Sequence, residues 1–135
     1  MDSDTTKKKW RTCVSVRIVH RDLDPEQVTT LLHTAASIAK RPGESRIPHG
    51  DCNSAGYWGV QHWIDEPKLP DHAFLWAEQF VAERLNIFKD FRSKGYGVNV
   101  YVGVFSNLLA LGFDIPATPT LWELGIIMGI EYFSA

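Results

Sequence analysis

The chain has 135 residues, of which 44% are hydrophobic and 22% charged, and its formal net charge is −2 at pH 7. This length and balance predict one globular domain with its own core, and they exclude both a disordered chain and a disulfide-dependent miniprotein. So small a net charge gives no broad field that would attract nucleic acid or anionic lipid, so we expect neither as a partner.

The compartment follows from the cysteines and the start of the chain. Cys13 and Cys52 lie far apart in the sequence, which is typical of reduced thiols rather than of a disulfide framework. No apolar stretch resembles a signal peptide or reaches the roughly 18 residues of a membrane span. We therefore expect a cytoplasmic protein without membrane association, with a flexible arm over residues 1–10 and a single domain over 11–135.

The first half of the domain predicts a strand, a helix and a long loop. In "TCVSVRIVHR" apolar residues alternate with others, which is the period-two pattern of a strand with one core face and one partly wet face. Asp24 can cap a helix that has Pro25 at its first position and an apolar stripe reaching Ala36. Residues 40–56 lose this periodicity and are rich in proline and glycine, so we expect a loop there.

The second half predicts strands separated by helices. "GYWGVQHW" alternates as a second strand, and Asp71 begins a long helix that runs to about Lys94 and ends at Gly95. "YGVNVYVGVF" is the clearest strand pattern in the chain. "LLALGFDI" could form a short strand, "ATPTLWELG" a short helix with Thr118 as its cap, and "IIMGIEYF" a final strand.

This order of elements predicts an α+β fold. The simplest arrangement is a mostly antiparallel sheet with two main helices and one short helix on one face, ferredoxin-like in style. Strands that are separated by helices could also include a parallel pair, so the order of the strands stays open.

Several of these segments resemble a bacterial family, domain of unknown function 4279. The resemblance rests on "DLDPEQVTTLL", "AKRPGE", "GYWGV", "RSKGYGVNVYV" and "LWELGIIMGIEYF", and it covers the chain from about Cys13 to Tyr132. The positions that match are Asp24, Pro25, Lys40, Gly43, Glu44, Trp58 and Gly95. The family carries no established catalytic or cofactor assignment, so the resemblance implies a fold and a bacterial origin rather than an activity.

The segment "RIPHGDCNSAGYWGVQHW" raises the question of a metal or catalytic site. Zinc needs three or four converging donors, usually at paired short spacings, and this segment has a single His-x-x-Cys. Cys52 also lacks a neighbouring element that would lower its pKa for nucleophilic work. We therefore predict no metal and no catalytic residues, and the alternative is a site made by His49, Cys52 and His62. No phosphate-binding glycine motif is present, so no cofactor is expected.

A small recognition surface is the preferred hypothesis. It would combine Lys40, Arg41, Glu44, Arg46 and Trp58 at the base of the long loop. In the competing interpretation Gly43 serves a turn, the charges are solvated and the tryptophan belongs to the core.

Two classes of function remain. The first is a non-catalytic binding or regulatory module, for example an immunity-type protein, that binds another protein or itself as a homodimer. An apolar interface through Trp76, Phe80 and Ile87 would support it. The second is a small enzyme or metal-binding protein with its site in residues 41–63. The lack of any catalytic motif favours the first.

Overall fold

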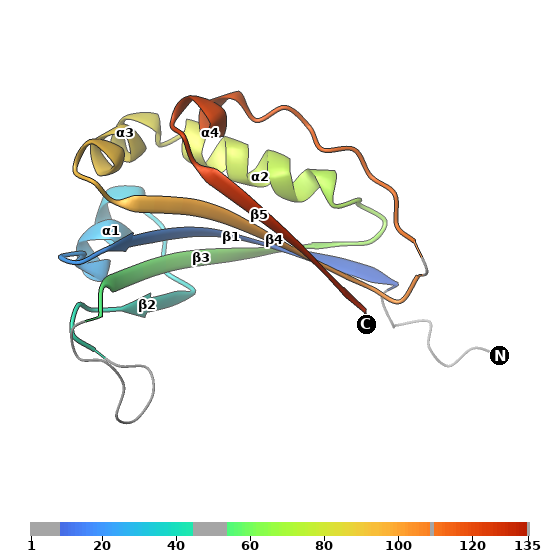
Figure 1. Ribbon diagram of the computed structural model, residues 1–135, viewed down its shortest axis with the longest axis horizontal. Helices are drawn as coiled ribbons and strands as arrows, with labels where there is room; N and C mark the ends of the chain where they lie inside the picture. The colour runs from blue at the N-terminus through green and yellow to red at the C-terminus, as the bar shows by residue number, and fades with distance from the viewer. Residues whose placement is uncertain (1–8, 45–53, 109, 135) are drawn as a thin grey trace.

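Five strands and four helices make up the computed structural model, which describes residues 9–44, 54–108 and 110–134 (Figure 1). The strands are β1 Trp10–His20, β2 Ile38–Lys40, β3 Gly56–Asp65, β4 Gly97–Ser106 and β5 Ile127–Ser134. The helices are α1 Pro25–Leu32, α2 Asp71–Ala82, α3 Leu85–Ser93 and α4 Pro119–Glu123.

The strands form one mixed sheet in the order β2-β3-β1-β4-β5. The first four strands of this order pair antiparallel, which is the arrangement of the split β-α-β, or ferredoxin-like, fold. β5 then adds to β4 in a parallel pairing, with Val102 opposite Ile130. The predicted α+β domain with a mostly antiparallel sheet is therefore confirmed.

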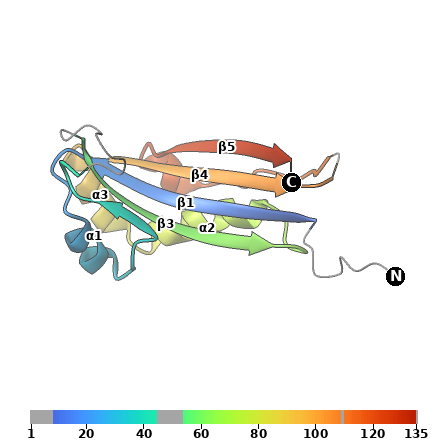
Figure 2. The same cartoon turned by 90° about the horizontal axis from the view of Figure 1, so that it is seen from below.

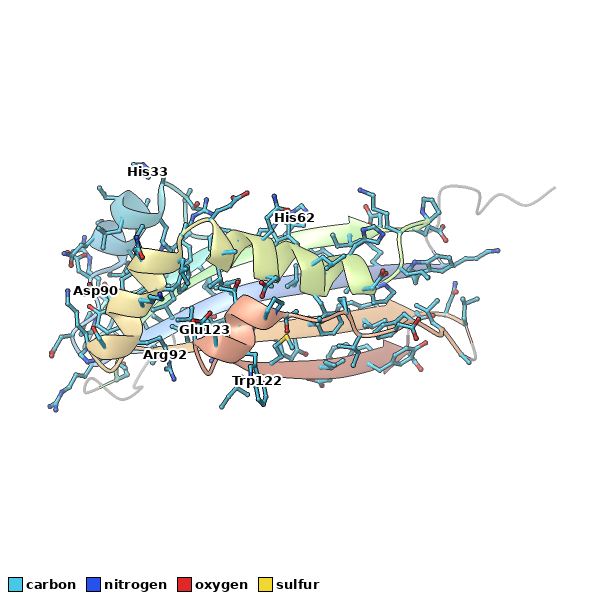
Figure 3. The ribbon with its side chains drawn as sticks, turned by 90° about the horizontal axis from the view of Figure 1, so that it is seen from above. His33, His62, Asp90, Arg92, Trp122 and Glu123 are labelled. Atoms are coloured by element: carbon cyan, nitrogen blue, oxygen red, sulfur yellow. The ribbon has the colours of Figure 1, made fainter. Side chains whose placement is uncertain are left out.

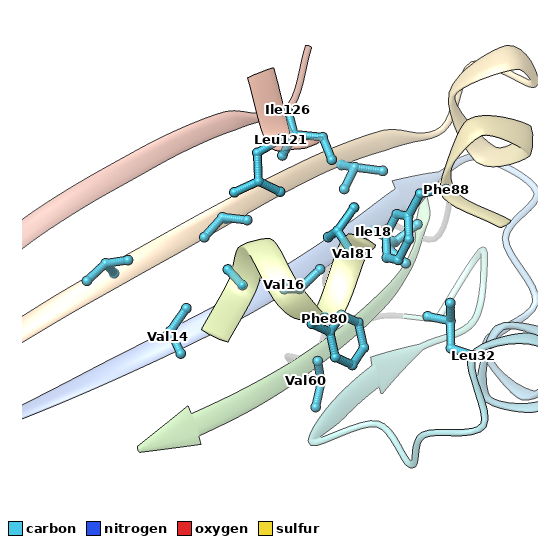
Figure 4. Close-up of a cluster of buried hydrophobic side chains, with 14 of the residues drawn as sticks. Val14, Val16, Ile18, Leu32, Val60, Phe80, Val81, Phe88, Leu121 and Ile126 are labelled. Atoms are coloured by element: carbon cyan, nitrogen blue, oxygen red, sulfur yellow. The ribbon is translucent and has the colours of Figure 1, made fainter. Parts of the chain in front are cut away.

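The core lies between one face of the sheet and the helices that cover it (Figures 1 and 3). The alternation along β1 and β4 directs one set of valines toward the helices, and these side chains are buried. Aromatic and aliphatic side chains of α2, α3 and α4 pack onto them (Figure 4). The core residues drawn from these elements include Val14, Val16, Ile18, Val100, Val102, Val104, Phe74, Val81, Phe88 and Leu121.

The long helix expected over residues 71–94 is divided in two. α2 ends at Ala82 and α3 begins at Leu85, although neither proline nor glycine lies between them. The Arg84 guanidinium donates to the main-chain oxygens of Leu32 and Phe80, at 2.9 and 3.0 Å, and to the Thr34 hydroxyl at 3.2 Å. Arg84 thus satisfies carbonyl groups at the carboxyl ends of both α1 and α2, which a continuous helix would not position for it.

Two further expectations for the first half of the chain are wrong. α1 ends at Leu32 and not near Ala36, because His33 adopts a left-handed conformation with φ of 52° that terminates the helix. Lys40, expected to begin the loop, is instead the last residue of β2, since residues 38–40 pair with residues 57–59 of β3. Trp10, which the sequence assigned to the N-terminal arm, is the first residue of β1, and its indole donates to the Lys68 oxygen at 2.9 Å.

The short strand expected at residues 108–115 does not form in the part of that segment that the structure describes. The reason is topological. β5 runs parallel to β4, and a parallel pair needs a crossover connection rather than a tight turn. The segment after β4 supplies this crossover and returns along the helix side of the sheet to α4 (Figure 1).

Candidate functional site

The predicted surface around Lys40 and Arg41 is held together by internal bonds. The Lys40 ammonium donates to the Glu44 main-chain oxygen at 3.0 Å, to the Ser54 hydroxyl at 2.6 Å and to the Ala55 oxygen. Arg41 pairs with Glu26, and this hydrogen bond lowers the pKa of Glu26 to about 2. These cations therefore fasten the chain on either side of residues 45–53 to β2 and α1.

Arg41 also lines a shallow depression of about 460 Å³ beside α1, together with Asp22, Asp24 and Glu26. A smaller hollow of about 150 Å³ brings Lys40, Arg41 and Glu44 together. The structure thus unites three of the five predicted binding residues. Gly43 has φ of 82°, so the turn that the competing interpretation assigned to it is present.

Trp58 lies apart from that surface. Its side chain is 0% exposed, and its indole nitrogen donates to the Thr29 hydroxyl at 3.0 Å. It is therefore a core residue that fixes α1 against β3 and cannot contact a partner. Arg46 falls outside the described residues.

The metal alternative has one member within the described residues. His62 lies on β3 and stacks on Trp76, with ring centroids 4.9 Å apart and planes 9° apart. His62 follows Gly56 by six residues along β3, so these two residues lie about 20 Å apart at 3.3 Å per residue. His49 and Cys52 lie outside the described part of the chain, and within that part no group of three His, Cys, Asp or Glu side chains could hold a metal ion.

The side chains suggested for an apolar interface, Trp76, Phe80 and Ile87, take part in the packing of α2 and α3. Phe80 is buried, Trp76 stacks on it at 5.2 Å, and Ile87 is half-buried against the core. Only Trp76 and Ile87 keep part of their surface accessible, so they offer a small apolar area rather than a broad one.

A different surface is left open by the fold. In the described chain no helix packs on the face of the sheet opposite the core, and Figure 2 shows this face with α2, α3 and α4 behind the strands. Register places four aromatic side chains on it, from three different strands. We call this set, together with two arginines, the open face: Trp63, Tyr101, Phe105, Phe133, Arg11 and Arg17.

Three of the four rings of the open face contact one another in a row, and the fourth, Tyr101, contacts Arg17. Trp63 and Phe105 belong to strands on either side of β1, and their ring centroids lie 5.8 Å apart, so they meet above β1. Phe105 stacks on Phe133 at 4.7 Å with planes 12° apart. Trp63 is 41% exposed, and the other rings are half-buried.

Glycine allows the rings to lie close to the sheet. A Cβ on Gly103 would come within 3.4 Å of both Tyr101 and Phe105 and within 3.6 Å of Phe133. The aromatic layer therefore seals a sheet face that has no helix over it. Cys13 and Ser15 of β1 are buried on this face, and burial raises the pKa of the Cys13 thiol, which makes it a poor nucleophile.

The two arginines of the open face differ in their partners. Arg11 lies over the Trp63 ring at 4.3 Å and pairs with Asp65 at 2.7 Å. Arg17 lies over the Tyr101 ring at 4.5 Å, but it has no ion pair among the described residues, and its buried Nε has no hydrogen-bond partner there. The Tyr101 hydroxyl donates to Glu131 at 2.7 Å.

Sequence reasoning placed these residues on the wet faces of their strands but did not bring them together. The alternation assigns Arg17 and Tyr101 to the side away from the core valines, which is correct. The sequence did not reveal the strand order. These side chains form one surface only because β3, β1, β4 and β5 are neighbours in the sheet.

A comparison of the chain with family models, with curated proteins and with solved structures found no match. The residues and their geometry are therefore the basis for any statement about function. Within the described residues no helix is long and apolar enough to cross a membrane.

Proposed function

We propose that this protein is a non-catalytic binding module that recognises another protein through the open face of its sheet. The observation that carries the proposal is the aromatic layer with Arg11 and Arg17 stacked on its rings. Tryptophan, tyrosine, phenylalanine and arginine are the residue types enriched at the centres of protein interfaces.

The stacked arrangement favours binding because its side chains are already ordered. Each ring contacts a neighbouring ring or guanidinium, and glycines beneath them leave the rings flat on the sheet. A surface that is ordered before it binds loses less side-chain entropy on association, which is about 0.5–1.5 kcal/mol for each side chain that would otherwise be immobilised.

Arg17 indicates the chemistry of the partner. Its guanidinium carries a charge without an acidic partner in the described chain, and its Nε is buried without an acceptor. Arg17 as a whole is half-buried, and a partner's carboxylate would neutralise its charge through the guanidinium nitrogens that stay accessible. We infer a partner that places an acidic or carbonyl group over Arg17 and apolar side chains over the rings.

The charges around the layer favour protein over nucleic acid. Aromatic sheet faces also stack the bases of single-stranded nucleic acid, but those surfaces track the phosphates with cations. Here Asp65 neutralises Arg11, Glu131 lies beside Tyr101, and the whole chain has a net charge of −2. A phosphate backbone would therefore meet little attraction on this face.

An immunity-type protein that neutralises a toxin by binding it is one class of such module, and it is the class that we propose. The alternative is a small enzyme or metal-binding protein with its site in residues 41–63. Of its candidate residues His49, Cys52 and His62, only His62 lies within the described residues, where it stacks on Trp76.

The test is capture of the partner with matched variants. The full chain is immobilised and exposed to a lysate of the cells that produce it, alongside Trp63→Ala, Arg17→Gln and Leu75→Ala. Leu75 is exposed on α2, on the other side of the sheet, and serves as the control. We expect one protein to be retained by the wild type and by Leu75→Ala, and its affinity to fall at least tenfold in the two open-face variants.

Circular dichroism of each variant establishes that the fold is intact before binding is compared. Two results would contradict the proposal: equal retention of the partner by Trp63→Ala and Arg17→Gln, or tight binding of a single-stranded RNA oligonucleotide in place of a protein.

A further inference from the structure

The two edge strands of the sheet differ in whether their residues would prevent pairing with another chain. β2 forms one edge with only three residues, which end in Lys40 and are soon followed by Pro42. Short length, lysine and proline are the devices that keep an edge strand from pairing with another chain. This edge is therefore protected.

β5 forms the other edge and has none of these devices. It has eight residues, contains neither lysine nor proline, and in the described structure no element pairs with its outer side (Figure 2). Its one charged residue, Glu131, accepts a hydrogen bond from Tyr101 on the open face and so does not guard the edge. An edge of this kind is a template for another strand.

Exposed apolar side chains gather along the same edge. Ile127 is 75% exposed, Ile130 48% and Tyr132 47%, and Trp122 of α4 is 86% exposed and projects toward the outer side of β5 (Figure 3). At about 200 Å² for a large side chain, these four expose on the order of 500 Å². Two copies would bury about 1,000 Å², which is the area a specific interface needs.

We propose that β5 pairs antiparallel with β5 of a second copy of this chain, with Ile130 opposite its own counterpart. This register uses the strand from Ile127 to Phe133 in full. It sets Tyr132 opposite Met128 on the helix side and Phe133 opposite Ile127 on the open face, so apolar side chains meet on both faces. Glu131 falls opposite Gly129 and meets no acidic residue.

Neighbouring registers are less favourable. A shift toward the carboxyl end places Glu131 opposite Glu131, and like charges directly opposite one another destabilise a strand pair. A shift toward the amino end leaves Tyr132 and Phe133 without partners. A register in which Ile130 lies opposite Glu131 or Gly129 would pair side chains of the helix side with side chains of the open face. Strand geometry forbids this, because directly opposite residues point to the same face of a sheet.

The proposal does not rest on the open-face function, because the outer edge of β5 and the rings over β1 share only Phe133. Sedimentation of the full chain measures it directly. We expect a mass of 15.3 kDa for the dilute chain and twice that value as concentration rises through about 1 to 100 μM, the range for a small interface.

Matched variants assign the dimer to β5. Ile130→Lys should sediment as a monomer throughout, because pairing would bring two ammonium groups together at the axis. Ile115→Lys changes an isoleucine that is somewhat more exposed than Ile130 and lies outside β5, so this variant should dimerise like the wild type. In a Cys52→Ser background, mild oxidation should cross-link Ile130→Cys, whereas Glu131→Cys, which faces Gly129, should not cross-link.

A wild-type chain that stays monomeric over this range overturns the proposal, as does a dimer that persists in Ile130→Lys or cross-links equally at the two cysteine positions. Trp63→Ala serves as the separating variant, because it should lose the partner of the open face and keep the dimer.

Discussion

At the scale of single residues, Glu78 shows how one side chain can begin an element forty residues away. Its carboxylate accepts hydrogen bonds from the main-chain nitrogens of Thr120 and Leu121, at 3.0 and 3.1 Å, and so caps the amino end of α4. The sequence predicted Thr118 for this task, but its side chain makes no capping hydrogen bond. α2 thereby fixes the position from which β5 starts.

Replacing Glu78 by alanine should lower the free energy of unfolding by about 1–2 kcal/mol, since two main-chain donors lose a charged acceptor. Thr118→Ala should change it by less than about 0.5 kcal/mol, because no bond is lost. Urea denaturation measures both. An equal loss in the two variants would assign the cap to Thr118 instead.

The hydrogen bond between Tyr101 and Glu131 makes the stability of the fold depend on pH in the alkaline range. The hydrogen bond to Glu131 raises the pKa of Tyr101 above its usual value of about 10. The hydrogen bond therefore makes its full contribution to the stability of the fold below about pH 10, and this contribution is lost as pH rises through the pKa that Tyr101 has in the folded state.

We expect the stability advantage of the wild type over Tyr101→Phe to be present at about pH 8 and to disappear at more alkaline pH. Unfolding in urea at several pH values measures it. Glu131→Gln is the control and should remove most of this pH dependence, because the acceptor then carries no charge. An advantage that grows with pH would contradict the assignment.

The sequence predicted correctly the roles that depend on residues close by in the chain. It missed the roles that depend on residues far away in the chain. Asp24 caps α1 and Pro25 opens it, both within the segment that displays the motif. Trp58 was correctly placed in the core by the competing interpretation. Glu78 carries no such signal, because the nitrogens that it binds are brought to it only by the folded chain.

At the scale of elements, Arg84 joins the carboxyl ends of α1 and α2 at the point where α3 begins. It bonds carbonyl groups of α1 and α2 and lies 4.0 Å from the Phe80 ring centroid, so the break between α2 and α3 is tied to the end of α1. The apolar stripe of residues 71–94 continues through the break and therefore predicts one helix. Periodicity cannot reveal a bend that an arginine stabilises through tertiary hydrogen bonds.

Arg84→Met should destabilise the fold by about 2–4 kcal/mol, because Met keeps the aliphatic volume but leaves the Leu32 and Phe80 carbonyl groups without their donor. Glu83→Ala is the matched control, since Glu83 is exposed and its ion pair with Arg84 spans 3.6 Å. It should change stability by less than about 0.5 kcal/mol. Urea denaturation followed by circular dichroism compares them, and a neutral Arg84→Met would show that the break has another cause.

Strand faces were predictable but strand neighbours were not. The alternation of β1 and β4 separates core valines from Arg17 and Tyr101, and the structure confirms that division. The parallel pairing of β5 with β4 depends on the crossover through α4, which no short-range pattern encodes. The candidate surface therefore emerged only when the topology was known.

At the scale of the whole molecule, pairing through the outer edge of β5 would increase the affinity of the open face for a repeated partner. Antiparallel pairing of β5 with its copy keeps equivalent faces on the same side, so a dimer would present two open faces on one continuous sheet. Two sites on one rigid body bind a repeated or dimeric partner more tightly than either alone, provided that the spacing allows both to engage.

Binding of a partner protein to the open face can be measured by site-specific photo-crosslinking in the cells that make the protein. A photoreactive amino acid is placed at Gln61, exposed on the open side of β3, and separately at Lys89, exposed on α3. If a partner covers the open face, a covalent adduct with another protein forms from position 61 and none forms from position 89. Adducts from position 89 alone, or none from position 61 when the protein is shown to be in a complex, would contradict binding at this face.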